Sequence, residues 1–302
     1  KAFSRFLEQA ELLRPASSKL RSSVSPRVAG VLQSASTSGP HPALLQWCLQ
    51  EIGWNDSDLV EDILRGFPLV GVIPIDSAAP LRSVRRSKLT VEALRAKSAE
   101  LRAQAIHKHT SSKHADLDSV IFDLTKEEIS LHRMTPFRDP KTGEGLLTRR
   151  FGVLQMDSKG VLKVRCIDDF ADSLVNDTTE ILRAIRMGRI SDLREVVKLL
   201  HESDTSADLV LLKSDFAAAY RGCPLLQDHL QYAKVLVRDP SSGELLETTL
   251  LAMPFGAVAA VYAWDRVGAA LQAVLQKMFL IPASRYVDDL FWADYEACSL
   301  RG

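Results

Sequence analysis

Three aspartates are the residues of this sequence best suited to chemistry. Asp215 ends an apolar run that begins at Leu209, and Asp288 and Asp289 stand side by side between two short apolar runs. A carboxylate at the end of a buried strand is unfavourable unless it is exposed at an edge or holds a cation. Adjacent carboxylates repel each other unless a positive charge compensates them. The alternative is an ordinary β-turn, in which Asp is common because its side chain stabilises turns.

If the two strands lie beside each other, the three carboxylates converge on one spot. Such a group can hold two Mg²⁺ ions about 3.5–4 Å apart for in-line phosphoryl transfer. Oxygen ligands favour Mg²⁺, or Mn²⁺ as a substitute, over zinc. The sequence therefore predicts a two-metal site, provided that the strands pair.

The elements that must position these residues are predicted to form an α+β fold. Residues 209–215 read as a buried strand, and the residues on either side of Asp288 as a hairpin. A long helix is expected over 257–279, another over 177–200, and a further hairpin over 149–168.

Residues 1–40 are rich in Ser, Ala and Pro and read as a poorly ordered leader. Residues 41–115 read as a helical region, with one helix beginning near Pro42 and a second capped by Asp56 or Ser57. The stretch 81–113 within it is strongly basic. It is either a solvated helix face or a surface that contacts nucleic acid, and the pattern leaves both open.

The composition is that of an ordinary globular protein, with 46% hydrophobic and 25% charged residues in 302. The 38 basic and 38 acidic residues balance, so net charge neither indicates nor excludes nucleic-acid binding. No apolar run is long enough to cross a membrane. The four cysteines form no CxxC pair, which favours a reducing, intracellular compartment without distinguishing cytoplasm from nucleus.

Four segments resemble motifs of reverse transcriptases of the retrotransposon type. Residues 286–289 (Tyr-Val-Asp-Asp) match the Tyr-x-Asp-Asp signature, and residues 215–220 (Asp-Phe-Ala-Ala-Ala-Tyr) resemble the first palm motif. Residues 253–257 (Met-Pro-Phe-Gly-Ala) resemble the Leu-Pro-Phe-Gly segment. Residues 165–176, which run from Arg through Asp-Asp-Phe to Asn, resemble the fingers segment. The motifs occur in the family's order and cover about residues 149–294.

The resemblance implies the fingers and palm of an RNA-directed DNA polymerase. The palm would be an antiparallel sheet of the split βαβ type with helices on one face, formed by residues 208–302. Residues 116–207 would form a fingers-like region. Few residues follow Asp289, so the resemblance also implies a truncated palm and an absent thumb.

The resemblance assigns the metal ligands residue by residue. Asp215 and Asp288 would be the principal catalytic ligands of Mg²⁺, Asp289 the supporting third carboxylate, and the backbone carbonyl of Phe216 a further ligand. The reaction would be nucleotidyl transfer to a primer 3′-hydroxyl, with charge compensation and positioning as the protein's contribution.

A nucleotide-binding set follows from the same resemblance: Lys163, Arg165, Ala219, Tyr220, Phe255 and Gly256. Tyr220 would exclude a ribose 2′-hydroxyl, and Arg165 would grip the triphosphate. For Lys163, an ordinary surface role on an exposed hairpin is an equal alternative.

The implied partners are a primed RNA or DNA template and deoxynucleoside triphosphates, with further polyprotein domains compatible with the pattern. Two other readings remain open. One is a catalytically inactive nucleic-acid-binding remnant of such a polymerase. The other is an unrelated α/β scaffold whose motifs are coincidental.

Overall fold

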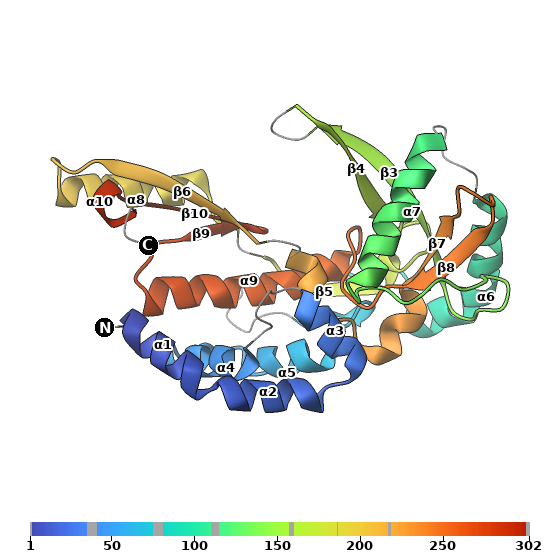
Figure 1. The fold of residues 1–302 in the computed structure, drawn as a ribbon, viewed down its shortest axis with the longest axis horizontal. Helices are drawn as coiled ribbons and strands as arrows, with labels where there is room; N and C mark the ends of the chain where they lie inside the picture. Colours follow the sequence, from blue (N-terminus) through green and yellow to red (C-terminus); the bar gives the residue numbers. More distant parts are fainter. Residues whose placement is uncertain are drawn as a thin grey trace.

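The computed structural model describes residues 2–34, 41–74, 81–109, 115–156, 160–185, 187–216 and 219–299. These residues form an α+β fold, with three small sheets and a set of helices that connect and cover them (Figure 1). No helix in these ranges is long and apolar enough to cross a membrane.

Three helices occupy the region for which we expected little order: α1 (Ala2–Leu12), α2 (Arg14–Ser23) and α3 (Pro26–Ser34). The expectation is wrong for residues 2–34, because Val28, Val31 and Leu32 lie on one helical face and are buried. The segment as a whole has low hydrophobicity, so its sequence did not indicate that these three residues are buried. The remainder of the expected leader, 35–40, lies outside the described residues.

The next two helices are α4 (Pro42–Glu51), as predicted, and α5 (Leu59–Arg65). α5 begins later than predicted, because Asp56 does not cap it and instead pairs with Arg266 of a distant helix. Gly66 ends α5 at φ 109°, a conformation that favours glycine.

A three-stranded sheet has the order β1-β5-β2, with β1 (Gly71–Val72), β2 (Leu81–Arg85) and β5 (Thr179–Arg183). β5 follows the short 3-10 helix η1 (Asn176–Thr178), and the predicted helix 177–200 is therefore wrong in its first part. The β-branched Thr179 and Ile181 are completely buried in the strand. Among the described residues of that stretch, α-helix is found only in α8 (Ile190–Ser203).

A four-stranded sheet has the order β4-β3-β7-β8. β3 (Leu147–Met156) and β4 (Leu162–Asp168) form the predicted hairpin, whose turn at 157–159 lies outside the described residues. The sheet continues through β7 (Lys234–Arg238) and β8 (Leu245–Thr249). The helices α6 (Val91–Lys108) and α7 (Ala115–Ser130) contact β3.

The third sheet is antiparallel throughout and has the order β6-β10-β9. It consists of β6 (Leu209–Asp215), β9 (Ser284–Tyr286) and β10 (Asp289–Tyr295), and the short α10 (Glu296–Ser299) follows it. β6 forms as predicted but is not buried, because it is an edge strand; Leu211, for example, is 68% exposed. α8 contacts β6 and β10, and the long α9 (Val258–Met278) contacts β9.

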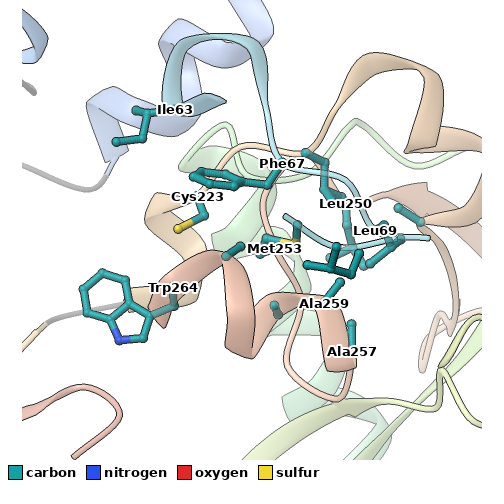
Figure 2. Packing of buried hydrophobic residues seen from close by; sticks show 14 of the residues in the cluster. Ile63, Phe67, Leu69, Cys223, Leu250, Met253, Ala257, Ala259 and Trp264 are labelled. Atoms are coloured by element: carbon teal, nitrogen blue, oxygen red, sulfur yellow. The ribbon is translucent and has the colours of Figure 1, made fainter. Parts of the chain in front are cut away.

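α9 lies at the centre of the molecule, between the third sheet and the N-terminal helices (Figure 1). Its buried residues are mostly small, such as Ala259 and Ala263, and include Trp264 and Val274. Figure 2 shows Ala259 and Trp264 among the buried side chains that include Phe67 and Met253. The 3-10 helices η2 (Ala219–Gly222) and η3 (Gln227–Tyr232) complete this core.

Candidate active site

β6 and β10 bring two of the three aspartates face to face. Asp289 pairs directly with Asp215 across the two antiparallel strands, so their side chains leave the same face of the sheet. Asp288 occupies the adjoining turn, where its backbone carbonyl accepts a hydrogen bond from the Phe216 amide at 3.1 Å. The strand pairing on which the predicted convergence depended is therefore present.

The turn that carries Asp288 has an unusual backbone. Val287 lies in the left-handed region at φ 57°, which is unfavourable for a β-branched residue. Two donors hold its carbonyl oxygen: Trp264 Nε1 at 2.8 Å and Arg285 Nη1 at 2.6 Å. Arg285 is almost completely buried and is itself paired with Asp265 of α9. The helix thus fixes the conformation of the turn.

Lys213 supplies a positive charge beside the aspartates. It lies two residues before Asp215 on the same face of β6, and its Nζ is 3.0 Å from Asp289 Oδ2. The hydrogen bond and charge of Asp289 raise the pKa of Lys213, with smaller contributions from Asp215 and Asp288. The structure therefore places the positive charge of Lys213 against Asp289.

The donor set fits a divalent cation by its chemistry, since it consists of carboxylate oxygens. The geometry is not that of a finished metal site: in the described ranges, no group of three or more His, Cys, Asp or Glu side chains is placed to hold a metal ion. Lys213 is the cation that contacts Asp289 instead. A metal ion bound by Asp289 would compete with this ion pair.

The residues that follow Asp215 pack toward the turn. Phe216 packs edge-on against Trp264, with ring centroids 5.0 Å apart, and Tyr220 packs edge-on against Phe255 at 5.2 Å. Burial raises the pKa of Tyr220, and the negative charge of Asp288 raises it further. Tyr220 therefore lies near Asp288. Ala219 is buried beside it.

Gly256, in the segment 253–257, packs against Asp168 of the segment 165–176. Its φ of 95° suits glycine, and an added Cβ would lie only 2.4 Å from the carbonyl oxygen of Asp168. The side chain of Asn176 spans the same loop: its Nδ2 donates to the Gly256 carbonyl, and its Oδ1 accepts from the Val258 amide, both at 2.9 Å. These contacts fix the loop that carries Phe255.

We expect Gly256→Ala to destabilise the chain by about 1–3 kcal/mol in urea denaturation, because strain and a clash with Asp168 add together. Gly243→Ala is the matched control. Gly243 also has a positive φ, of 74°, but its Cβ would meet no atom within 4 Å. Equal losses for the two variants would contradict the close approach to Asp168.

Lys163 and Arg165 lie on one face of β4, where they pair with Gln155 and Val153 of β3. Both are exposed. Together with Phe255 they line a pocket of about 430 Å³. None of the three aspartates lines this pocket, so the structure connects the two basic residues to Phe255 rather than directly to the carboxylates.

Sequence reasoning missed three residues at this site: Lys213, Trp264 and Arg285. Strand alternation could have placed Lys213 on the face of Asp215. No local pattern indicates that Trp264 and Arg285 share the carbonyl of Val287, because the contact with Trp264 joins residues 23 positions apart.

Comparison of the chain with models of known protein families gives no match, and comparison with curated protein sequences gives no significant match.

Proposed function

We propose that this chain is the fingers-and-palm part of an RNA-directed DNA polymerase of the retroelement type. It would add deoxynucleotides to the 3′-hydroxyl of a primer on a nucleic-acid template. The third sheet would be the palm, and the β3–β4 hairpin with α7 would belong to the fingers.

One observation carries this proposal: the pairing of β10 with β6 sets Asp289 opposite Asp215 and leaves Asp288 in the adjoining turn. Carboxylates brought close together in this way can serve as ligands of the two metal ions used in phosphoryl transfer. The influence of all three charges on Lys213 supports their proximity.

Each residue of the site would have a separate role. Asp215, Asp288 and Asp289, with the Phe216 carbonyl, would hold Mg²⁺, or Mn²⁺ in its place. When bound, these ions supply activation of the primer hydroxyl and charge compensation for the departing pyrophosphate. Tyr220 would stand beneath the sugar of the incoming nucleotide, supported by its packing on Phe255. Arg165 and Lys163 would attract the triphosphate.

The function is tested by incubating the chain with a primed RNA template, one labelled deoxynucleotide and Mg²⁺. We expect addition of one nucleotide when the template base matches, and no addition when EDTA removes the metal. Addition that is independent of the template base, or that continues in EDTA, would contradict the proposal.

The ion pair between Lys213 and Asp289 favours a second candidate, an inactive nucleic-acid-binding remnant, because it neutralises one of the three carboxylates. The polymerase and the inactive remnant are distinguished by comparing nucleotide addition by the parent and by Lys213→Met. Binding of the primed template without addition, both in the parent and in Lys213→Met, would support the remnant. Addition by either chain would support the polymerase.

Tyr220 should control the choice between deoxyribose and ribose. We expect Tyr220→Ala to raise incorporation of ribonucleotides relative to deoxynucleotides by at least about tenfold, because the space for a 2′-hydroxyl opens. Tyr220→Phe keeps the ring and should keep the preference. Competition between the two nucleotides in primer extension measures the ratio, and an unchanged ratio in Tyr220→Ala would exclude the steric role.

A further inference from the structure

Arg285 connects the turn at Asp288 to α9. Its side chain is only 1% exposed. Nη1 donates to the Val287 carbonyl at 2.6 Å, Nη2 pairs with Asp265 of α9, and Nε has no hydrogen-bond partner among the described residues. The orientation of the guanidinium therefore depends on one polar contact with the turn and one with the helix.

The backbone around Arg285 leaves space for this side chain. The Arg285 carbonyl accepts a hydrogen bond from the Gly188 amide at 2.7 Å, which fixes the position of β9. On α9, Gly268 is buried, and a Cβ at this position would lie 3.0 Å from both Cδ and Nε of Arg285. Glycine inside a helix is less favourable than alanine. Here it allows α9 to approach the Arg285 side chain closely.

The turn depends on these contacts because Val287 has an unfavourable backbone. A β-branched residue at positive φ persists only where its surroundings hold it in place. The Trp264 indole supplies one hydrogen bond to the Val287 carbonyl, at 2.8 Å, and the charged Arg285 supplies the stronger one. Asp265 compensates the charge of Arg285. Without it, a buried guanidinium has lost its carboxylate partner, which is strongly unfavourable.

We propose that Asp265 is a positioning residue of the candidate active site, which acts through Arg285 on the turn that carries Asp288. Asp265 lies outside the four segments that resemble polymerase motifs. Its effect on nucleotide addition rests on the proposed function, whereas its effect on the turn does not. The two ideas can therefore fail separately.

Hydrogen exchange of the Trp264 indole measures how firmly the turn is held, without metal, template or nucleotide, since this indole donates to the Val287 carbonyl. The indole signal that Trp264→Phe removes identifies it among the four tryptophans. We expect this proton to exchange at least about tenfold faster in Asp265→Asn than in the parent, because local opening of the turn exposes it.

Asp62→Asn is the matched control. It makes the same chemical change in another ion pair of α9, that of Arg266 with Asp62. Asp62 is 23% exposed and Asp265 is 19% exposed, and both pair with an almost completely buried arginine. We expect Asp62→Asn to leave the exchange rate of the indole within about twofold of the parent's.

Gly268→Ala guards against misfolding of Asp265→Asn, because it disturbs the same side chain without removing a charge. The added methyl group requires the Arg285 side chain to shift by a few tenths of an ångström. We expect the Trp264 indole to exchange at least about threefold faster than in the parent.

Single-nucleotide addition to a primed RNA template measures the consequence for the chemistry. We expect Asp265→Asn to lower the rate at saturating deoxynucleotide by about tenfold and to leave the half-saturating concentration within about twofold, because the metal ligand is misplaced while the proposed nucleotide contacts remain. Asp62→Asn should keep both values.

Indole exchange as slow in Asp265→Asn and Gly268→Ala as in the parent would contradict the proposal, and so would equal acceleration in Asp62→Asn. In a parent that adds nucleotides, an unchanged rate in Asp265→Asn would contradict it as well. A parent without activity, in which only Asp265→Asn and Gly268→Ala accelerate exchange, would refute the proposed function but support the effect of Asp265 on the turn.

Discussion

Replacement of Asp288 by Asn is expected to reduce the rate of nucleotide addition by at least about 10²-fold without unfolding the chain. The change removes one negative charge from the proposed metal ligands. Loss of the charge stabilisation that a bound metal provides is worth several kcal/mol in the transition state, and each 1.36 kcal/mol is a factor of ten in rate. Single-nucleotide addition to a primed RNA template under single-turnover conditions measures the effect.

Asp294→Asn is the matched control, because it makes the same chemical change on β10, the strand that follows the turn at Asp288. Asp294 pairs with Val210, far along β10 from the turn, and its Oδ1 accepts a backbone hydrogen bond that an Asn oxygen can also accept. It should retain the parent's rate. Similar rates for Asp288→Asn and the parent would show that nucleotide addition does not need the Asp288 carboxylate.

Replacement of Arg266 by Met is expected to lower the free energy of unfolding by about 3–5 kcal/mol. Arg266 is 3% exposed and lies on α9. It makes a bidentate pair with Asp56, at 2.8 and 2.9 Å, and donates to Asp62 at 2.7 Å. Without it, the buried Asp56 carboxylate has lost its guanidinium partner, which is more costly than loss of the pair as a whole. Urea denaturation measures the change.

The double variant Arg266→Met, Asp56→Leu separates these contributions. It removes both buried charges and should recover most of the lost stability, since well-packed apolar residues can replace a buried ion pair at little cost. Arg194→Met, in an exposed pair with Glu195, should stay within about 0.5 kcal/mol of the parent. A double variant as unstable as Arg266→Met would show that packing, rather than the unpaired Asp56, causes the loss.

The parts of the fold that the sequence predicted are those with a strong local pattern. The hairpin that ends at Asp168 and the helix that begins at Val258 show clear periodicity, and the strand that ends at Asp215 has a continuous apolar run. All three elements form. The strand β5 was mistaken for helix because a short buried strand next to a helix has no distinct period. α3 was missed because its few apolar residues stand in a polar, Ser-rich context.

In the candidate site, too, the residues with a local sequence pattern were predicted and those held by long-range contacts were not. The sequence pattern indicated the carboxylates, and the resemblance to reverse transcriptase motifs indicated Tyr220. Strand pairing then set Asp289, rather than Asp288, directly opposite Asp215. The contacts that hold the site are long-range. Asn176 reaches Gly256 across 80 positions, and Trp264 reaches the turn at Val287 from another element. Such pairs depend on the folded topology, which a local pattern does not contain.

The most direct test of the account is whether the turn at Asp288 binds a divalent cation. Mn²⁺ binding can be followed by electron paramagnetic resonance in the presence of a template, a chain-terminated primer and the matching deoxynucleotide, so that no bond forms. The same mixture without protein gives the baseline. We expect the parent and Asp294→Asn to bind Mn²⁺ above this baseline, and Asp288→Asn to bind it at least about tenfold more weakly. Equal Mn²⁺ binding by all three chains would contradict the assignment of the metal site to these aspartates.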